Sequence, residues 1–174
     1  MSTTVGELKE ALKKVLPTLP HKMGVLAIEF SMERFRNEDW FDTSSVKWKP
    51  RKSKKDDKGR KLLVKSAVLK NSIRIVKESP QETVVGTDVK YAKVHNEGDQ
   101  STVTVKTHTR TVSVYQTSKS NKKKIQSGTK KVTVQSHSRK NNIPQRQYLG
   151  ESQALTKRLV DMVGNEIYNS LNKK

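Results

Sequence analysis

The chain has 174 residues, of which 32% are hydrophobic and none is cysteine, and its formal net charge is +19. This length is typical of one domain with a core that is small relative to its surface, and the lack of cysteine excludes disulfides, a thiolate nucleophile and a cysteine zinc site. No apolar run approaches the roughly 20 residues that cross a bilayer, and the chain does not open with a signal-peptide pattern. We therefore expect a soluble protein that is made in the cytoplasm and does not enter a membrane.

Residues 1–37 are predicted to form two N-terminal helices. Thr4 followed by Glu7 is a capping box, which marks a helix start, and the apolar residues that follow fall on one helical stripe until Pro17. Pro17 and Pro20 are interpreted as bracketing a hinge. A second helix is expected from residue 22 to the end of this region, with an apolar face wide enough to be buried.

Residues 38–61 are predicted to be a long basic surface loop, because proline, glycine and a cluster of lysines and arginines interrupt every periodic pattern. Ten basic side chains accompany two acidic ones within residues 47–65. Trp40, Phe41 and Trp48 are interpreted as covering the edge of a small core. The alternative is that they stack on nucleic-acid bases, each stack being worth about 1–3 kcal/mol.

Residues 62–98 are predicted to fold as a central helix–hairpin–helix unit. The apolar spacing at the start of this segment predicts a helix, with Ser66 capping the turn that follows. Strict alternation over residues 73–77 and a turn at Pro80 then predict an antiparallel hairpin. A second short helix is expected to end at Gly98.

Residues 101–142 are predicted to form an inserted basic β-hairpin arm. Valine and threonine alternate strictly on both sides of a polar loop over residues 116–128, which indicates two strands with one weakly apolar face and one basic face. A two-stranded ribbon is only marginally stable alone in water. We therefore expect the arm to extend the central sheet or to become ordered against a partner subunit.

The arm has ten basic side chains and no acidic one. Such a charge is typical of a segment that contacts something outside the folded domain. The candidate contacts to DNA phosphates or to an acidic face of a neighbouring protein are Lys106, Arg110, Lys122, Lys123, Lys124, Lys130 and Lys131. A third interpretation is a solvated arm whose lysines protect a sheet edge from aggregation.

The last predicted element is a helix over residues 151–172, in which apolar residues recur at spacings of three and four. We expect this apolar face to pack on the sheet. The sequence thus predicts a single α+β domain, in which a small antiparallel sheet packs against a long C-terminal helix and N-terminal helices, with a projecting basic β-hairpin.

No pattern of residues indicates catalysis. The four histidines are scattered without a helical pair that could bind a metal, and neither a nucleophile elbow nor a phosphate-binding loop is present. His95 is interpreted as a packed histidine at a helix end that hydrogen-bonds to backbone. We therefore expect no enzymatic activity, no cofactor and no metal.

Two segments of the chain resemble the phage virion morphogenesis family. The residues that carry this resemblance are Ser66, Leu69, Ser72, Ile73, Gly86, Tyr91, Ala92, His95 and Gly98, followed near the C-terminus by Arg146, Tyr148, Leu149 and Gly150. Three positions depart from the family pattern. Ala67 stands where glycine is usual, Gln147 where proline is usual, and Tyr148 where phenylalanine is usual.

The resemblance implies a structural protein of the virion that completes the tail or joins it to the head. Its implied partners are other virion proteins at the head–tail junction or tail end, together with further copies of itself in a ring. The alternative is a small basic protein that binds nucleic acid through its two Lys/Arg-rich segments. The affinity of such a protein should fall by about 10³–10⁵ between about 50 and 200 mM salt.

Overall fold

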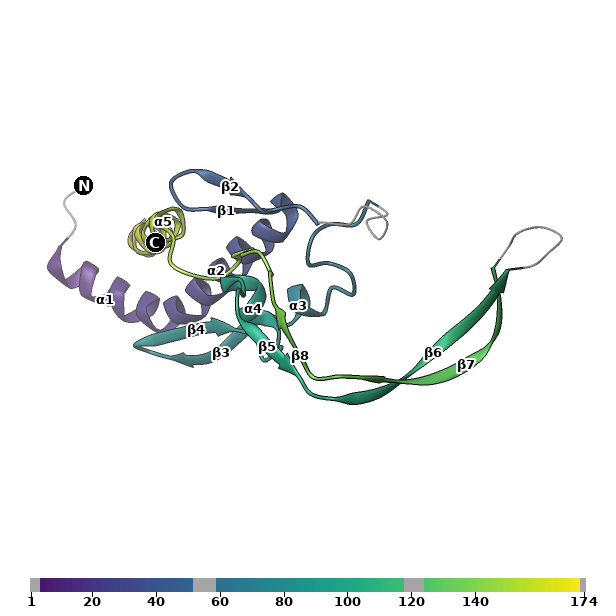
Figure 1. Cartoon of the computed structure of the whole chain (residues 1–174). Helices are drawn as coiled ribbons and strands as arrows, with labels where there is room; N and C mark the ends of the chain where they lie inside the picture. Colours follow the sequence, from purple (N-terminus) through teal and green to yellow (C-terminus); the bar gives the residue numbers. More distant parts are fainter. Residues whose placement is uncertain (1–3, 52–58, 118–123, 173–174) are drawn as a thin grey trace. The chain divides into compact units, whose positions relative to one another are not determined.

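The computed structural model describes residues 4–51, 59–117 and 124–172, and the chain divides into two compact units. One unit comprises Met1–Gly98 and Ile143–Lys174, and we call it the body; the other, Asp99–Asn142, we call the ribbon. Helices and small antiparallel sheets are both present (Figure 1). The predicted α+β class is therefore confirmed.

The first helix of the body, α1 (Val5–Val15), begins at the predicted capping box. The Thr4 hydroxyl accepts a hydrogen bond from the Glu7 amide at 3.2 Å, and the Glu7 carboxylate accepts one from the Thr4 amide at 2.9 Å. This reciprocal pair satisfies two amides that would otherwise lack a partner at the helix start. Residues at the start of α1 therefore supply the hydrogen bonds that stabilise its first turn.

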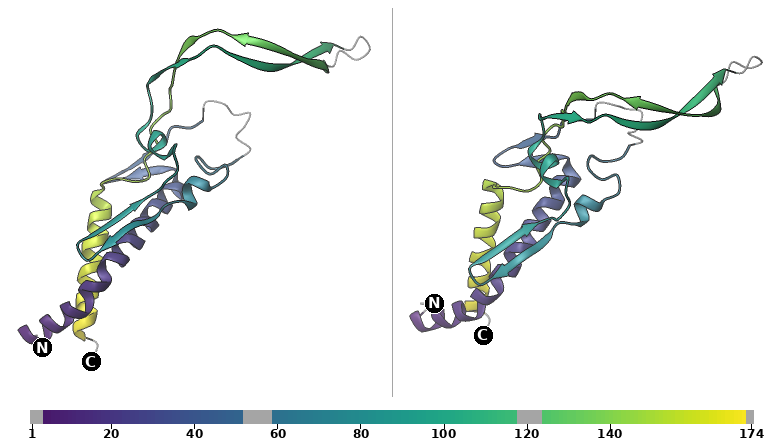
Figure 2. Two further views of the ribbon diagram at one scale, coloured as in Figure 1. Left: turned by 90° about the horizontal axis from the view of Figure 1, so that it is seen from below. Right: turned by 60° about the horizontal axis from the view of Figure 1, so that its bottom comes forward.

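The predicted break between the two N-terminal helices is present at Pro17, but it is a 3₁₀ turn and it ends before Pro20. A 3₁₀ turn, η1 (Leu16–Thr18), leads directly into α2 (Leu19–Asn37), so the second helix starts earlier than residue 22. Each proline occupies one of the first two positions of its helix, where no amide hydrogen is needed and the fixed φ of proline suits the helix. The two helices therefore follow one another with only a change of direction (Figure 2).

A short hairpin replaces part of the predicted loop over residues 38–61. Glu38 has a left-handed backbone (φ 55°) and ends α2, after which β1 (Asp39–Phe41) and β2 (Ser45–Lys47) pair antiparallel. Strands of three residues are too short to show a period of two, so the sequence indicated only a loop. Residues 52–58 of that loop lie outside the described residues.

The central hairpin has the predicted form. β3 (Arg74–Ser79) and β4 (Glu82–Gly86) pair antiparallel on either side of the turn at Pro80. The short helix α4 (Ala92–Glu97) follows and ends at Gly98. These elements follow from local signals, namely alternation along each strand and a residue that stops each element.

The helix predicted at the start of residues 62–98 is wrong in extent. Only α3 (Val68–Asn71) is helical, because Leu63 and Ala67 have left-handed backbone conformations with φ of 58° and 56°, which a continuous right-handed helix excludes. The residue that precedes α3 is Ala67, and no side chain caps this helix. The predicted cap by Ser66 is therefore also wrong.

The C-terminal helix α5 (Gln153–Asn172) is confirmed, but it packs mainly against α1 and α2 (Figure 2). The expected packing on the sheet is therefore replaced mostly by packing on helices. The hairpin has only two strands, and α2 lies closely against both. A Cβ atom on Gly24 of α2 would lie 2.5 Å from Ile75 Cδ1 and 2.8 Å from Thr83 Cγ2, so the glycine allows this close approach.

The core of the body is small and rich in aromatic rings. Trp48 meets Phe35 edge to face at a centroid distance of 5.7 Å, and its indole N–H donates to the Gln147 carbonyl at 2.9 Å. Trp40 packs edge to face against Phe30 at 5.9 Å. The interpretation that these tryptophans cover the edge of a small core is confirmed, with Trp48 buried and Trp40 half-buried. The central cluster consists of Phe35, Trp48, Leu62, Leu69, Ile73, Ala92 and Tyr148.

The ribbon consists of two antiparallel strand pairs. β5 (Thr102–Val105) pairs with β8 (His137–Lys140), and β6 (His108–Thr117) pairs with β7 (Lys124–Val134). In the described part of the chain, neither pair has a third strand, and neither joins the β3–β4 hairpin. The expectation that the arm extends the central sheet of its own chain is therefore wrong.

Candidate interaction surfaces

Asn96 joins the two segments that carry the family resemblance. Its side-chain oxygen accepts hydrogen bonds from the amides of Tyr148 and Leu149, each at 3.0 Å. Its side-chain nitrogen donates to the Leu149 carbonyl at 3.0 Å. The Asn96 side chain on α4 therefore hydrogen-bonds to the backbone of the segment that leads into α5 and fixes its position.

Arg146 holds the same segment from its other side. Its guanidinium Nε and Nη2 donate to the Lys49 carbonyl at 3.1 and 2.9 Å, and its backbone amide donates to the His95 carbonyl at 2.8 Å. Burial lowers the pKa of Arg146, as does the nearby charge of Arg51, whereas Glu38 acts in the opposite direction. The contacts of Arg146 are those of a structural residue that fixes two loops to one another.

His95 packs edge to face against Tyr91 at 5.7 Å. Burial lowers the pKa of the His95 imidazole, and the positive charge of Arg146 lowers it further. The buried Nδ1 atom has no hydrogen-bond partner among the residues that the structure describes. The ring is thus packed at a helix end as expected, but the expected backbone hydrogen bond is not made at Nδ1.

Most of the remaining residues of the resemblance lie in or near the core. Leu69 and Ile73 are buried, and the Ser72 hydroxyl donates to the Leu69 carbonyl at 2.8 Å and lies 2.6 Å from the Thr87 hydroxyl. Gly98 has a φ of 80°, and a Cβ there would lie 2.9 Å from the Gln145 amide nitrogen. These contacts are structural, since they pack and hydrogen-bond the segments of the body against one another. Ser66 is exposed, and Gly86 ends β4.

The sequence patterns did not predict the buried ion pair between Arg34 and Asp39. Arg34 and Asp39 are only 3% and 4% exposed, and Arg34 Nη1 lies 3.0 Å from Asp39 Oδ1. The Ser45 hydroxyl donates to the other Asp39 oxygen at 2.6 Å, and the guanidinium lies 4.6 Å from the centre of the Phe30 ring. The available signal was an arginine four residues after Phe30 and five residues before Asp39, which begins β1.

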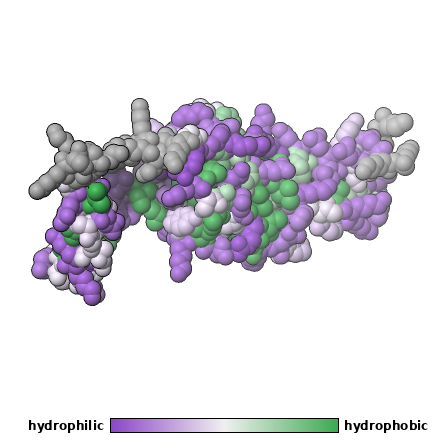
Figure 3. Space-filling view, turned by 90° about the vertical axis from the view of Figure 1, so that its right-hand side faces the viewer, coloured by the Kyte–Doolittle hydropathy of each residue, from purple (hydrophilic) through white to green (hydrophobic). Residues whose placement is uncertain are grey.

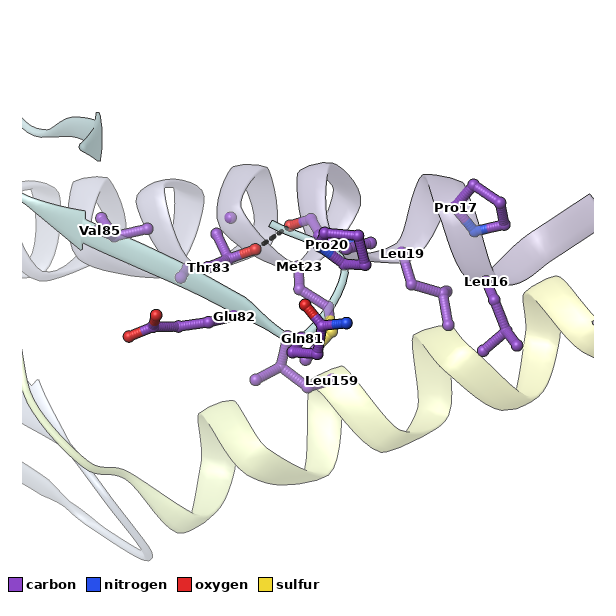
Figure 4. Close-up of a pocket in the computed structure, with 13 residues that line it drawn as sticks. Leu16, Pro17, Leu19, Pro20, Met23, Gln81, Glu82, Thr83, Val85 and Leu159 are labelled. Atoms are coloured by element: carbon purple, nitrogen blue, oxygen red, sulfur yellow. Dashed lines mark hydrogen bonds between the residues drawn. The ribbon is translucent and has the colours of Figure 1, made fainter. Parts of the chain in front are cut away.

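An apolar pocket of about 540 Å³ lies where η1 and α2 meet the β3–β4 turn and α5 (Figure 4). A smaller hollow of about 200 Å³ shares Met23 and Leu159 with it, and we call the two together the η1–α5 groove. At its edge Thr83 donates to the Pro20 carbonyl at 2.8 Å. The lining residues are Leu16, Pro17, Leu19, Pro20, Met23, Gly24, Ala27, Pro80, Gln81, Glu82, Thr83, Val85, Leu159, Val160 and Val163.

The candidate cations of the ribbon that the structure describes are exposed, but they do not share one face. Partners in an antiparallel ladder point to the same side; Arg110 and Lys130 each pair with a valine, whereas Lys131 and Lys124 pair with threonines. The valines of β6 and β7 share one face as predicted, but the cations do not all lie on the other, because neighbours such as Lys130 and Lys131 point to opposite sides of a strand. Lys106 lies between β5 and β6 and is exposed. Lys122 and Lys123 lie outside the described residues.

A comparison with protein families bears on both units. The model of the phage virion morphogenesis family matches residues 5–168. The chain belongs to this family. No match was found among curated proteins or among solved structures. The protein therefore has a structural role in phage morphogenesis as a component of the virion, where it interacts with other virion proteins.

Two departures of this family member from the usual pattern have a structural consequence. Ala67 has a left-handed backbone, which explains why glycine is usual at this position. Tyr148 is 1% exposed, and its hydroxyl donates to the Ala92 carbonyl at 3.0 Å. Burial raises the pKa of this phenol to about 12. The usual phenylalanine would fill the same space without this hydrogen bond.

Within the described ranges, no helix is long and apolar enough to cross a membrane. The same residues contain no group of three or more histidine and acidic side chains that could hold a metal ion.

Proposed function

We propose that this virion morphogenesis protein acts in tail completion or head-to-tail joining, through contacts between copies arranged in a ring. The observation that carries this proposal is the incomplete cover of α5. None of its twenty residues, all of which lie in the described part of the chain, is buried. Burial of each large apolar side chain is worth about 1.5–3 kcal/mol, so this stripe gains stability when another protein surface covers it.

The surface of the body supports the same proposal. Leu16 of η1 and Val160 of α5 are exposed and line the η1–α5 groove. Leu8 of α1 and Tyr168 of α5 are exposed as well. On the face shown in Figure 3, hydrophilic residues predominate and hydrophobic residues gather in patches among them. Apolar patches rimmed by polar residues are typical of surfaces that bind protein.

The test is a stop codon at Leu62 in the parent phage or prophage, followed by induction and negative-stain electron microscopy of the lysate. Heads and tails that accumulate unjoined, or tails that are incomplete or of abnormal length, are the expected result. A synonymous change at the same codon is the control, and it should leave normal particles. Intact infectious particles in normal number after the stop codon would overturn the proposal.

The second candidate is a nucleic-acid-binding protein, and the charge of the ribbon favours it. Residues 101–142 have ten basic side chains and no acidic one, and the cations project from both faces of β6–β7. Binding to DNA would neutralise several phosphates, so affinity should fall by about 10³–10⁵ between about 50 and 200 mM salt. A steep salt dependence that disappears on deletion of residues 101–142 supports this candidate, and a flat salt dependence rejects it.

A further inference from the structure

The body has an exposed apolar helix end as well as an open apolar groove. Val5 is 85% exposed and Leu8 is 41% exposed, and they lie three residues apart on one side of α1. The capping box fixes this end as helix, and Lys13 and Glu10 form an ion pair at 2.8 Å further along. Figures 1 and 2 show the first turns of α1 extending past α5. A helix that presents apolar residues at such spacing is suited to bind in a groove.

The groove is built to receive apolar side chains. Met23 of α2, Gln81 of the hairpin turn and Leu159 of α5 lie close together around it (Figure 4). Glu82 at its edge forms an ion pair with Lys77, and Thr83 is hydrogen-bonded to Pro20. The polar groups at the edge thus have partners within the chain, and the remaining lining is mostly apolar.

The exposed helix end cannot reach the groove of its own chain. Ala11 and Val15, on the same helix, are buried, and α1 packs against α5. Leu16 lines the groove. Val5 precedes Leu16 by eleven residues, which at the rise of an α-helix separates the two residues by about 16 Å along the helix axis. The two complementary surfaces therefore meet only between copies.

We propose that the first turns of α1 of one copy dock in the η1–α5 groove of a neighbouring copy. This inference rests on the proposed function, since it names the contact by which copies associate. The two surfaces differ and lie at different places, so the contact is head-to-tail, which leads to a closed ring or an open filament. Because the groove is mainly apolar, this association should depend little on salt, unlike nucleic-acid binding by the ribbon.

The absence of cysteine from the chain makes the contact testable by site-specific cross-linking. V5C and Q81C are each placed in the full chain and mixed in equal amounts with a short flexible bismaleimide, and the products are separated by denaturing electrophoresis. Both positions are exposed, so neither substitution should disturb folding. The mixture is expected to give a covalent dimer, and the V5C/Q81C double variant a ladder of larger species. The matched control replaces Q81C with S44C, an exposed position in the β1–β2 turn.

A second substitution separates a specific contact from random collision. Introducing L8D into the V5C chain should lower the yield of cross-linked dimer by at least about tenfold, because a carboxylate would enter an apolar groove. A yield no higher than with S44C, or a yield that L8D leaves unchanged, overturns the inference. The stop-codon experiment decides the proposed function separately: unjoined heads and tails together with a negative cross-linking result would retain that function and reject this contact.

Discussion

The body and the ribbon are held together by different kinds of contact. The body depends on side chains that are distant in sequence, such as Asn96 bound to the backbone at Tyr148 and Leu149, and Trp48 bound to Gln147. The ribbon depends on the backbone ladder of β6 and β7, with only four half-exposed valines of these strands on one face. Single side chains should therefore matter greatly in the body and little in the ribbon.

The largest effect is expected from Asp39→Ala. This substitution leaves the Arg34 guanidinium buried without its principal partner, and breaking a buried ion pair costs about 3–5 kcal/mol. The free energy of unfolding, measured in urea by tryptophan fluorescence, should fall by that amount. Asp161→Ala, an exposed position on α5, is the control and should change it by less than about 0.5 kcal/mol. A loss at Asp39 as small as the control would contradict the role of the ion pair.

Gly24→Ala should have the next largest effect. The added methyl group would overlap Ile75 Cδ1 and Thr83 Cγ2, and overpacking costs about 1–3 kcal/mol, which exceeds the gain of about 0.5–1 kcal/mol from a better helix former. Urea denaturation should show a net loss of about 1–2 kcal/mol. Gly164→Ala is the matched control, because a Cβ at Gly164 in α5 meets nothing within 4 Å. It should instead stabilise the protein by about 0.5–1 kcal/mol.

Ala67→Gly should stabilise the body. Alanine in a left-handed conformation is unfavourable by about 1–2 kcal/mol, and part of the gain is offset by the greater freedom of glycine in the unfolded chain. Thermal unfolding should show a net gain of about 0.5–1 kcal/mol. Ala154→Gly in α5 should destabilise by a similar amount. The same sign for both substitutions would show that the conformation of Ala67 is not the cause.

His95 should make a smaller, pH-dependent contribution. Its pKa is lowered in the folded state, first by burial and then by Arg146, so the unfolded chain binds the proton more readily. Stability contributed by neutral His95 is complete above the unfolded pKa of about 6.5 and is lost as pH falls below it. His95→Asn should flatten the dependence of the free energy of unfolding on pH between about 7 and 5. An unchanged slope would contradict this assignment.

The smallest effect on the body is expected from Val132→Thr in the ribbon. Both tryptophans, Trp40 and Trp48, belong to the body, so tryptophan fluorescence reports on that unit. Its urea transition should shift by less than about 0.5 kcal/mol, while amide exchange in β6 and β7 should become faster. A large shift of the fluorescence transition would mean that the two units unfold together.

Local patterns in the sequence determined much of the fold. The capping box at Thr4, the alternation that gives β3 and β4, and the spacing of apolar residues in α5 each act over a few residues, and each element is present in the structure. The positive charge of residues 101–142 is likewise a property of the sequence alone. The family resemblance was also visible, because its residues lie in two short runs.

Tertiary structure alone decided the features that join distant residues. The left-handed Ala67, the hydrogen bonds of Asn96 and the Arg34–Asp39 pair depend on neighbours that no periodic pattern specifies. The η1–α5 groove arises because α2 packs on a two-stranded hairpin while α5 packs mainly on helices. The register that places Arg110 beside Val132 and Lys130 beside Val112 likewise depends on how β6 and β7 pair. Short-range spacing thus selects the elements, whereas packing and pairing decide which of their faces remain open to a partner.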